Sequence, residues 1–177
     1  MSWITKPIKR PPPGLREFEA YDHFRFDYRS INENTLSLFH PVRARYIKDR
    51  YDESLTDAET IIFRGCLGSA DTHSAVAHAL WMFRVTREFG PVLAKDFADA
   101  YELTIRPREE FAGRLMDLYN NWVGRVLASD DHILDRDGVE VIERALKQGM
   151  LQTAPDPKYT KENIQSELDR IRSKIIC

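Results

Sequence analysis

The chain has 177 residues, enough for one domain with a sizeable core and an appended arm. Its 42% hydrophobic and 31% charged residues are typical of a soluble globular protein, and its net charge of -2 gives no clear nucleic-acid or anionic-membrane signal. The absence of any apolar run near the roughly 20 residues that span a bilayer excludes a transmembrane segment. The N-terminus lacks the apolar core of a secretory signal, so we expect cytoplasmic synthesis without a signal peptide.

Residues 1–52 are predicted to form an N-terminal arm rich in proline and aromatic residues. The prolines of "KPIKRPPPG" fix φ and disfavour helix in the residues before them. In "HFRFDYR", Phe24, Phe26 and Tyr28 alternate with charged residues, which predicts a short strand or an extended segment that lays rings on a surface. The mixture of basic and aromatic residues would also fit a nucleic acid, but we favour an aromatic clamp with a solvated charged face.

Helical patterns dominate the predicted core domain, residues 53–152. The first begins at "TDAE", a capping box in which Thr56 caps the helix and Glu59 reaches back to it. Glycine and proline residues punctuate four further helices, which we expect near 71–89, 91–105, 107–129 and 139–149. Residues 153–177 are predicted to be a linker and an amphipathic helix packed on the core. The expected fold is therefore mainly α, a compact domain of about six helices.

Two of these helices turn an ionisable residue toward the interior. His78 lies in the middle of an apolar arc of its helix. Glu102 continues a line of alanines, whose small side chains permit close helix approach, so we expect its carboxylate to point toward a neighbouring helix. Lys95 and Asp99 on another face of the same helix form an i, i+4 pair that we expect in solvent.

The helix that contains "RLMDLYNNWVGR" is apolar on most of its sides and should be buried on most of them. Asp117 and Asn121 nevertheless share one stripe with Gly124, which would let another backbone come close. A carboxylate buried without a partner costs several kcal/mol. We therefore expect three helices to bring together one ionisable residue each: His78, Glu102 and Asp117.

The chemistry of this centre has three readings. In the catalytic reading His78 is a general base, Asp117 orients it, and Glu102 is the complementary acid or a second orienter. The same three residues would instead suit a divalent metal ion, or they would form a structural network that fixes helix register and requires no cofactor. The candidate substrate-binding residues are Asn120, Asn121, Trp81, Arg125 and Tyr101.

The segments "AHALWMFRVTREFGPVLAKDFADAYE" and "MDLYNNWVGR" resemble a poorly characterised family of bacterial domains, found in secreted proteins and at the C-terminal ends of polymorphic toxins. Its pattern is Arg-His-x-x-Trp, a helix that ends His-Glu, and Met-Asp-x-x-Asn-Asn-x-x-Gly-Arg. Ala77 and Tyr101 stand where the family has Arg and His, which implies altered specificity or lost activity. The matching residues, which span about a third of the chain, are His78, Trp81, Glu102, Met116, Asp117, Asn120, Asn121, Gly124 and Arg125.

That resemblance implies an antibacterial effector or toxin domain, delivered by a specialised secretion system, with a cognate immunity or delivery protein as partner. A second resemblance is to prokaryotic phospholipases A2, which place a His-Asp pair on antiparallel helices. Ala79 stands where those enzymes have a calcium-binding Asp, which argues against a calcium-dependent reaction. We therefore expect a toxin-type hydrolase, and the alternative is a non-catalytic helical interaction protein, such as an adaptor or an immunity partner.

Overall fold

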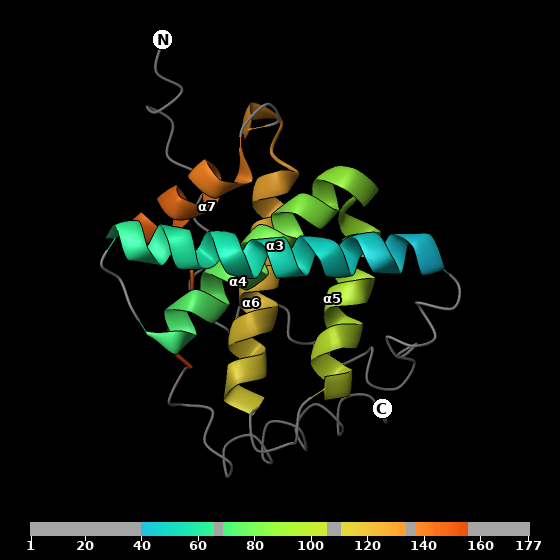
Figure 1. Cartoon of the computed structure of the whole chain (residues 1–177), viewed down its shortest axis with the longest axis horizontal. Helices are drawn as coiled ribbons and strands as arrows, with labels where there is room; N and C mark the ends of the chain where they lie inside the picture. Colours follow the sequence, from blue (N-terminus) through green and yellow to red (C-terminus); the bar gives the residue numbers. More distant parts are fainter. Residues whose placement is uncertain (1–39, 66–68, 106–110, 134–136, 156–177) are drawn as a thin grey trace, which may run out of the picture.

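The computed structural model describes residues 40–65, 69–105, 111–133 and 137–155 (Figure 1). These ranges hold α-helices and a short 3-10 helix and contain no strand, so the described part of the chain is mainly α, as predicted. The expected strand near 24–28 and the expected C-terminal helix lie outside the described residues. The elements are α3 (Pro41–Gly65), α4 (Ala70–Phe89), α5 (Pro91–Ile105), α6 (Phe111–Ala128), η4 (Asp131–Ile133) and α7 (Gly138–Lys147).

Helix α4 is the centre of the arrangement, because it packs against α3, α5, α6 and α7. Figure 1 shows α3 crossing in front of the other helices, with α5 and α6 standing side by side behind it. Hydrogen bonds join Ser74 to Asp117 and His78 to Asn121, so α4 and α6 run in the same direction. Gly90, with a φ of 84° that favours glycine, reverses the chain between α4 and α5.

Helix α3 begins at Pro41, so the predicted helix start at Thr56 is wrong. Thr56 lies inside α3, where its hydroxyl donates to the carbonyl of Asp52 one turn earlier. Residues 41–52, which we expected in the arm, form the first half of this helix. Proline fits the first turn because its missing N–H has no helical partner there. The buried face includes Ser54 and Ala58, and these polar and small residues hide the hydrophobic period in the sequence.

The end of α4 and the start of α5 follow the predicted positions of glycine and proline, while the predicted helix start at Pro107 and helix end at Gly68 lie outside the described residues. Helix α4 ends at Phe89 and α5 begins at Pro91, both as expected. Helix α4 begins at Ala70, a residue or two before the predicted start, because the side chain of Ser69 caps it by accepting from the N–H of Thr72 at 3.1 Å. Asp137 caps α7 in the same way, and Gly149 follows that helix with a φ of 66°.

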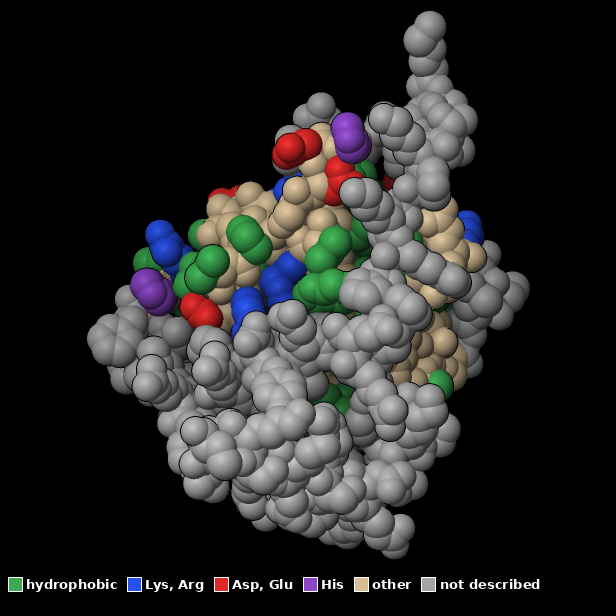
Figure 2. Space-filling view, turned by 180° about the vertical axis from the view of Figure 1, so that it is seen from behind, with side chains coloured by type: hydrophobic (Ala, Val, Ile, Leu, Met, Phe, Trp, Pro, Cys, Tyr) green, Lys and Arg blue, Asp and Glu red, His purple; other side chains and the backbone are tan. Residues whose placement is uncertain are grey.

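Helices α4 and α6 approach one another at Gly124, as the stripe of small residues predicted. A Cβ at this position would lie 2.1 Å from the carbonyl oxygen of Ala79, which leaves room for no other residue without a shift. In the described ranges, no helix combines the length and the apolar character that crossing a membrane requires. On the face shown in Figure 2, Lys and Arg side chains lie beside hydrophobic ones near the middle of the described surface.

Candidate functional site

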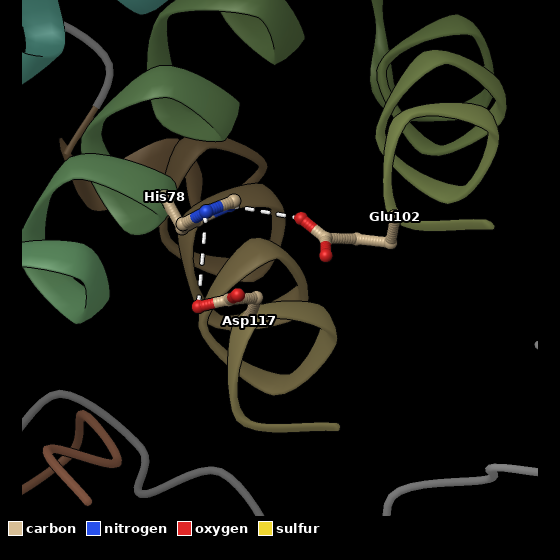
Figure 3. A group of neighbouring side chains, drawn as sticks. All are labelled: His78, Glu102 and Asp117. Atoms are coloured by element: carbon tan, nitrogen blue, oxygen red, sulfur yellow. Dashed lines mark ion pairs between the residues drawn. The ribbon is translucent and has the colours of Figure 1, made fainter. Parts of the chain in front are cut away.

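The three ionisable residues predicted to converge do so in the interior (Figure 3). His78 on α4 lies with its Nδ1 3.5 Å from Oε1 of Glu102 on α5, and with its Nε2 3.7 Å from Oδ1 of Asp117 on α6. The exposed fraction is 1% for His78, 1% for Glu102 and 0% for Asp117. The predicted convergence is therefore confirmed, and this group is called the His78 centre below.

The helix connections explain why these residues meet. Gly90 divides an antiparallel pair of helices, and His78 lies as many residues before it as Glu102 lies after it. The two side chains therefore fall at the same height of the α4–α5 pair. Helix α6 runs parallel to α4, so Asp117 and Asn121, one turn apart, stand opposite Ser74 and His78, which are also one turn apart.

The contact with Asn121 determines which ring nitrogen of His78 carries the proton when the imidazole is neutral. Its Oδ1 lies 3.1 Å from Nδ1 of His78, and because an amide oxygen only accepts, Nδ1 is the donor. In the neutral form the lone pair of the ring is then at Nε2, on the side of Asp117. The other amide atom of Asn121, Nδ2, is buried and has no hydrogen-bond partner among the described residues.

Aromatic rings from three helices surround the imidazole. The ring centroids of Tyr51, Trp81 and Tyr101 lie 6.0, 6.1 and 6.3 Å from that of His78. The hydroxyl of Tyr101 donates to that of Tyr51 at 3.2 Å, and the indole N–H of Trp81 donates to the carbonyl of Ile47. Burial, with the hydrogen bond to Tyr101, raises the pKa of Tyr51 above its ordinary value. Trp81 and Tyr101, predicted to bind substrate, thus line the His78 centre.

The side chain of Asn120 forms hydrogen bonds with the backbone that follows α7. Its Nδ2 donates to the carbonyl of Gln152 at 2.9 Å, and its Oδ1 accepts from the N–H of Gln152 at 3.0 Å. Next to this pair, the hydroxyl of Tyr119 donates to the carbonyl of Met150 at 3.3 Å. The structure therefore gives Asn120 an anchoring contact to the backbone of Gln152.

Arg125 belongs to a second buried polar group. Asp99 is only 1% exposed and pairs with Nζ of Lys95 at 2.5 Å, so the expectation that both members of this pair lie in solvent is wrong for Asp99. Arg125 is buried on α6, and burial lowers the pKa of its guanidinium to about 10, while the charge of Asp99 opposes this shift. The buried carboxylate of Asp99 and the buried guanidinium of Arg125 on α6 therefore attract one another.

The His78 centre could hold a metal ion only after a rearrangement. His78, Glu102 and Asp117 each offer one ligand atom, and these atoms all lie within 4.8 Å of one another. One imidazole and two carboxylates suit several divalent ions. The carboxylates, however, face different ring nitrogens, so an ion on one nitrogen would require the other carboxylate to swing.

Ser74 is a member of the site that sequence reasoning missed. Its Oγ donates to Oδ1 of Asp117 at 2.9 Å, the same oxygen that faces Nε2 of His78. The sequence does carry a signal, because Ser74 lies one helical turn before His78 and therefore on the same face of α4. Ser74 is half-buried, whereas the members of the His78 centre are fully buried.

A family model described as a domain of unknown function, DUF6973, matches residues 34–152. This range covers the described helices α3 to α7 and all members of the His78 centre. No curated protein and no solved structure matches the chain.

Proposed function

The chain belongs to the DUF6973 family, a domain of unknown function, and from the geometry of its core we propose that it is a toxin-type bacterial effector with hydrolase activity. The observation that carries the proposal is the imidazole of His78 held between Asp117 and Glu102, one carboxylate at each ring nitrogen. Each carboxylate interacts more favourably with the imidazolium than with the neutral ring, and these two contacts oppose the cost of burying the charge.

His78 acts in this proposal as the general base. Asn121 keeps the proton of the neutral ring at Nδ1, which leaves Nε2 to receive the proton of a water or a hydroxyl. Asp117, next to Nε2, and Glu102, next to Nδ1, both stabilise the imidazolium that then forms. Delivery by a specialised secretion system and a cognate immunity or delivery protein follow from the toxin role and are part of the proposal.

A second candidate is a non-catalytic helical interaction protein. It is favoured by the burial of His78, Glu102 and Asp117, whose exposed fractions of 0 to 1% are typical of a structural polar network inside a core. In this reading the contacts of the His78 centre fix the register of α4, α5 and α6, and the partner binds elsewhere. The two candidates differ in what His78 does and are separated by one experiment.

The experiment expresses the wild type, His78→Gln and Asp117→Asn in the bacterial cytoplasm and, with an added export signal, in the periplasm. His132→Gln is the matched control, since His132 is exposed in η4. The hydrolase predicts growth arrest by the wild type and the control in one compartment, and none by either site variant at equal folded protein, verified by circular dichroism and thermal melting. Arrest in the periplasm would indicate a wall or lipid substrate.

The non-catalytic interaction protein predicts a different result. The wild type then leaves growth unchanged in both compartments, and His78→Gln and Asp117→Asn only lower the melting temperature. Arrest that persists in a folded His78→Gln variant would also contradict the proposed hydrolase.

A further inference from the structure

The group that attacks the substrate must both join the His78 centre and reach the surface. His78, Glu102 and Asp117 are at most 1% exposed, so none of them reaches a bulky substrate in this structure. Ser74 meets both conditions, because it is half-buried and its Oγ donates to Oδ1 of Asp117 at 2.9 Å. We propose, on the basis of the hydrolase function above, that Ser74 is the nucleophile of the site and that its substrate is a carboxylic ester.

Two other half-buried hydroxyl groups lie near His78, and neither is suited to this role. The hydroxyls of Tyr51 and Tyr101 bond to one another at 3.2 Å, whereas the hydroxyl of Ser74 bonds to a carboxylate that can take its proton. Burial raises the pKa of Tyr51, which keeps this phenol protonated and poorly nucleophilic. A serine hydroxyl attacks only when a neighbouring base removes its proton, and Ser74 alone of these three has a carboxylate as its acceptor.

The carboxylate that accepts the hydrogen bond from Ser74 also lies close to the imidazole of His78. Oδ1 of Asp117 receives the Ser74 hydrogen bond and lies 3.7 Å from Nε2 of His78. As Oγ attacks the carbonyl carbon of the ester, its proton passes to Asp117 and on to Nε2, which forms an imidazolium between two carboxylates. The C–O bond to the alcohol then breaks, and the alcohol leaves with that proton. Water, deprotonated by the same route, cleaves the acyl-serine ester and releases a carboxylic acid.

The charge of the His78 centre selects the substrate class. A serine nucleophile can attack an acyl carbon or a phosphorus atom, and a phosphate ester carries negative charge at neutral pH. The carboxylate of Asp117 accepts from Ser74 and is buried in one group with that of Glu102, and like charges repel strongly in a low dielectric. A neutral carboxylic ester brings no such charge, so the geometry favours acyl transfer over phosphoryl transfer.

The test treats the full chain with an alkyl fluorophosphonate, which forms an O–P bond to an activated serine and releases fluoride. Intact-mass analysis and peptide mapping should show one adduct, on Ser74. The adduct should be absent in Ser74→Ala, and labelling of Asp117→Asn should slow by about 100-fold, as expected on loss of a general base. Ser129→Ala is the matched control and should label like the wild type, because Ser129 is exposed and its hydroxyl donates to the backbone carbonyl of Arg125 rather than to a carboxylate.

Absence of an adduct on the folded wild type, or an adduct that persists in Ser74→Ala, would overturn the proposal. The growth experiment separates this failure from failure of the proposed function. If Ser74→Ala arrests growth like the wild type while His78→Gln does not, the hydrolase stands and its nucleophile is water. If the wild type is harmless but labels on Ser74, the serine nucleophile stands and the toxin role falls.

Discussion

Gly124 of α6 lies against the backbone of Ala79 in α4, at the point where a Cβ would stand 2.1 Å from a carbonyl oxygen. The hydrogen bonds from Ser74 to Asp117 and from His78 to Asn121 join the same two helices just before this contact. The close approach at Gly124 therefore sets the distance across which the site is built, and a larger residue there would separate the polar pairs.

Gly124→Ala should lower the free energy of unfolding by about 3 kcal/mol, because the added methyl group meets backbone that cannot move aside. This loss would exceed the gain of about 1 kcal/mol in helix propensity. Urea denaturation measures the difference. Gly90→Ala is the control: no atom lies within 4 Å of the added Cβ, so only its positive φ contributes, at about 1 kcal/mol. Equal losses in the two variants would show that the contact with Ala79 is not tight.

Asn120→Ala should destabilise the protein by about 2 kcal/mol, because it leaves both the N–H and the carbonyl of Gln152 without their partner. The measurement is thermal or urea unfolding, together with amide hydrogen exchange of the segment after α7, which should become faster. Gln148→Ala, an exposed change directly after the end of α7, serves as the control. An Asn120→Ala variant with unchanged exchange at Gln152 would contradict the anchoring contact.

Asp99→Ala should cost about 3 kcal/mol, because Arg125 then stays buried without the neighbouring carboxylate that offsets its desolvation. Asp96→Ala is the matched control on α5. Burial raises the pKa of Asp96, so the fold already disfavours its charged form, and its removal should change stability little. Comparison of the two by urea denaturation tests the pairing, and a loss in Asp96→Ala as large as in Asp99→Ala would refute it.

Stability should fall at alkaline pH because of Tyr51. Its pKa is raised in the folded state, while the unfolded chain titrates near the ordinary value of 10.0. Below pH 10 both states keep the proton; above it the unfolded state loses the proton first and is stabilised. The contribution of Tyr51 therefore declines as pH rises, by at most about 1.4 kcal/mol per pH unit.

Tyr51→Phe removes this titration, so the stability difference between wild type and variant should shrink between about pH 9 and pH 11. Urea denaturation at each pH gives the free energies of unfolding of the wild type and of the variant. The other tyrosines are present in both proteins, so their titration cancels from the difference. Tyr46→Phe makes the same chemical change on the same helix and serves as the control. A difference for Tyr51→Phe that stays constant over this range would show that the Tyr51 pKa is not raised.

The sequence was sufficient to predict the His78 centre because helical period alone decides which way a residue faces. His78, Glu102 and Asp117 each interrupt an apolar or small-residue stripe, and such stripes are buried. The start of α5 and the end of α4 were predictable for a similar local reason, since proline and glycine act on their own backbone. The catalytic, substrate-binding and metal roles of these residues stay predictions.

Other features could not be predicted from the sequence, because they depend on contacts with residues that are distant along the chain. Asp99 resembled a solvated helix partner of Lys95, and only the packing of Arg125 from α6 makes it a buried one. Asn120 bonds a backbone that is remote in the sequence, at Gln152. The start of α3 was missed because its core face uses residues such as Ser54, whose polarity disguises burial.

Because the chain reverses at Gly90, the three members of the His78 centre are not all held in the same way. His78 and Asp117 belong to the parallel pair α4 and α6, which is tied by side-chain hydrogen bonds on either side of the ring. Glu102 arrives on α5, a helix of 15 residues that follows directly after the glycine. Undocking of α5 would take Glu102 away from the imidazole and leave the Ser74–Asp117 and His78–Asn121 bonds in place, because neither bond involves that helix.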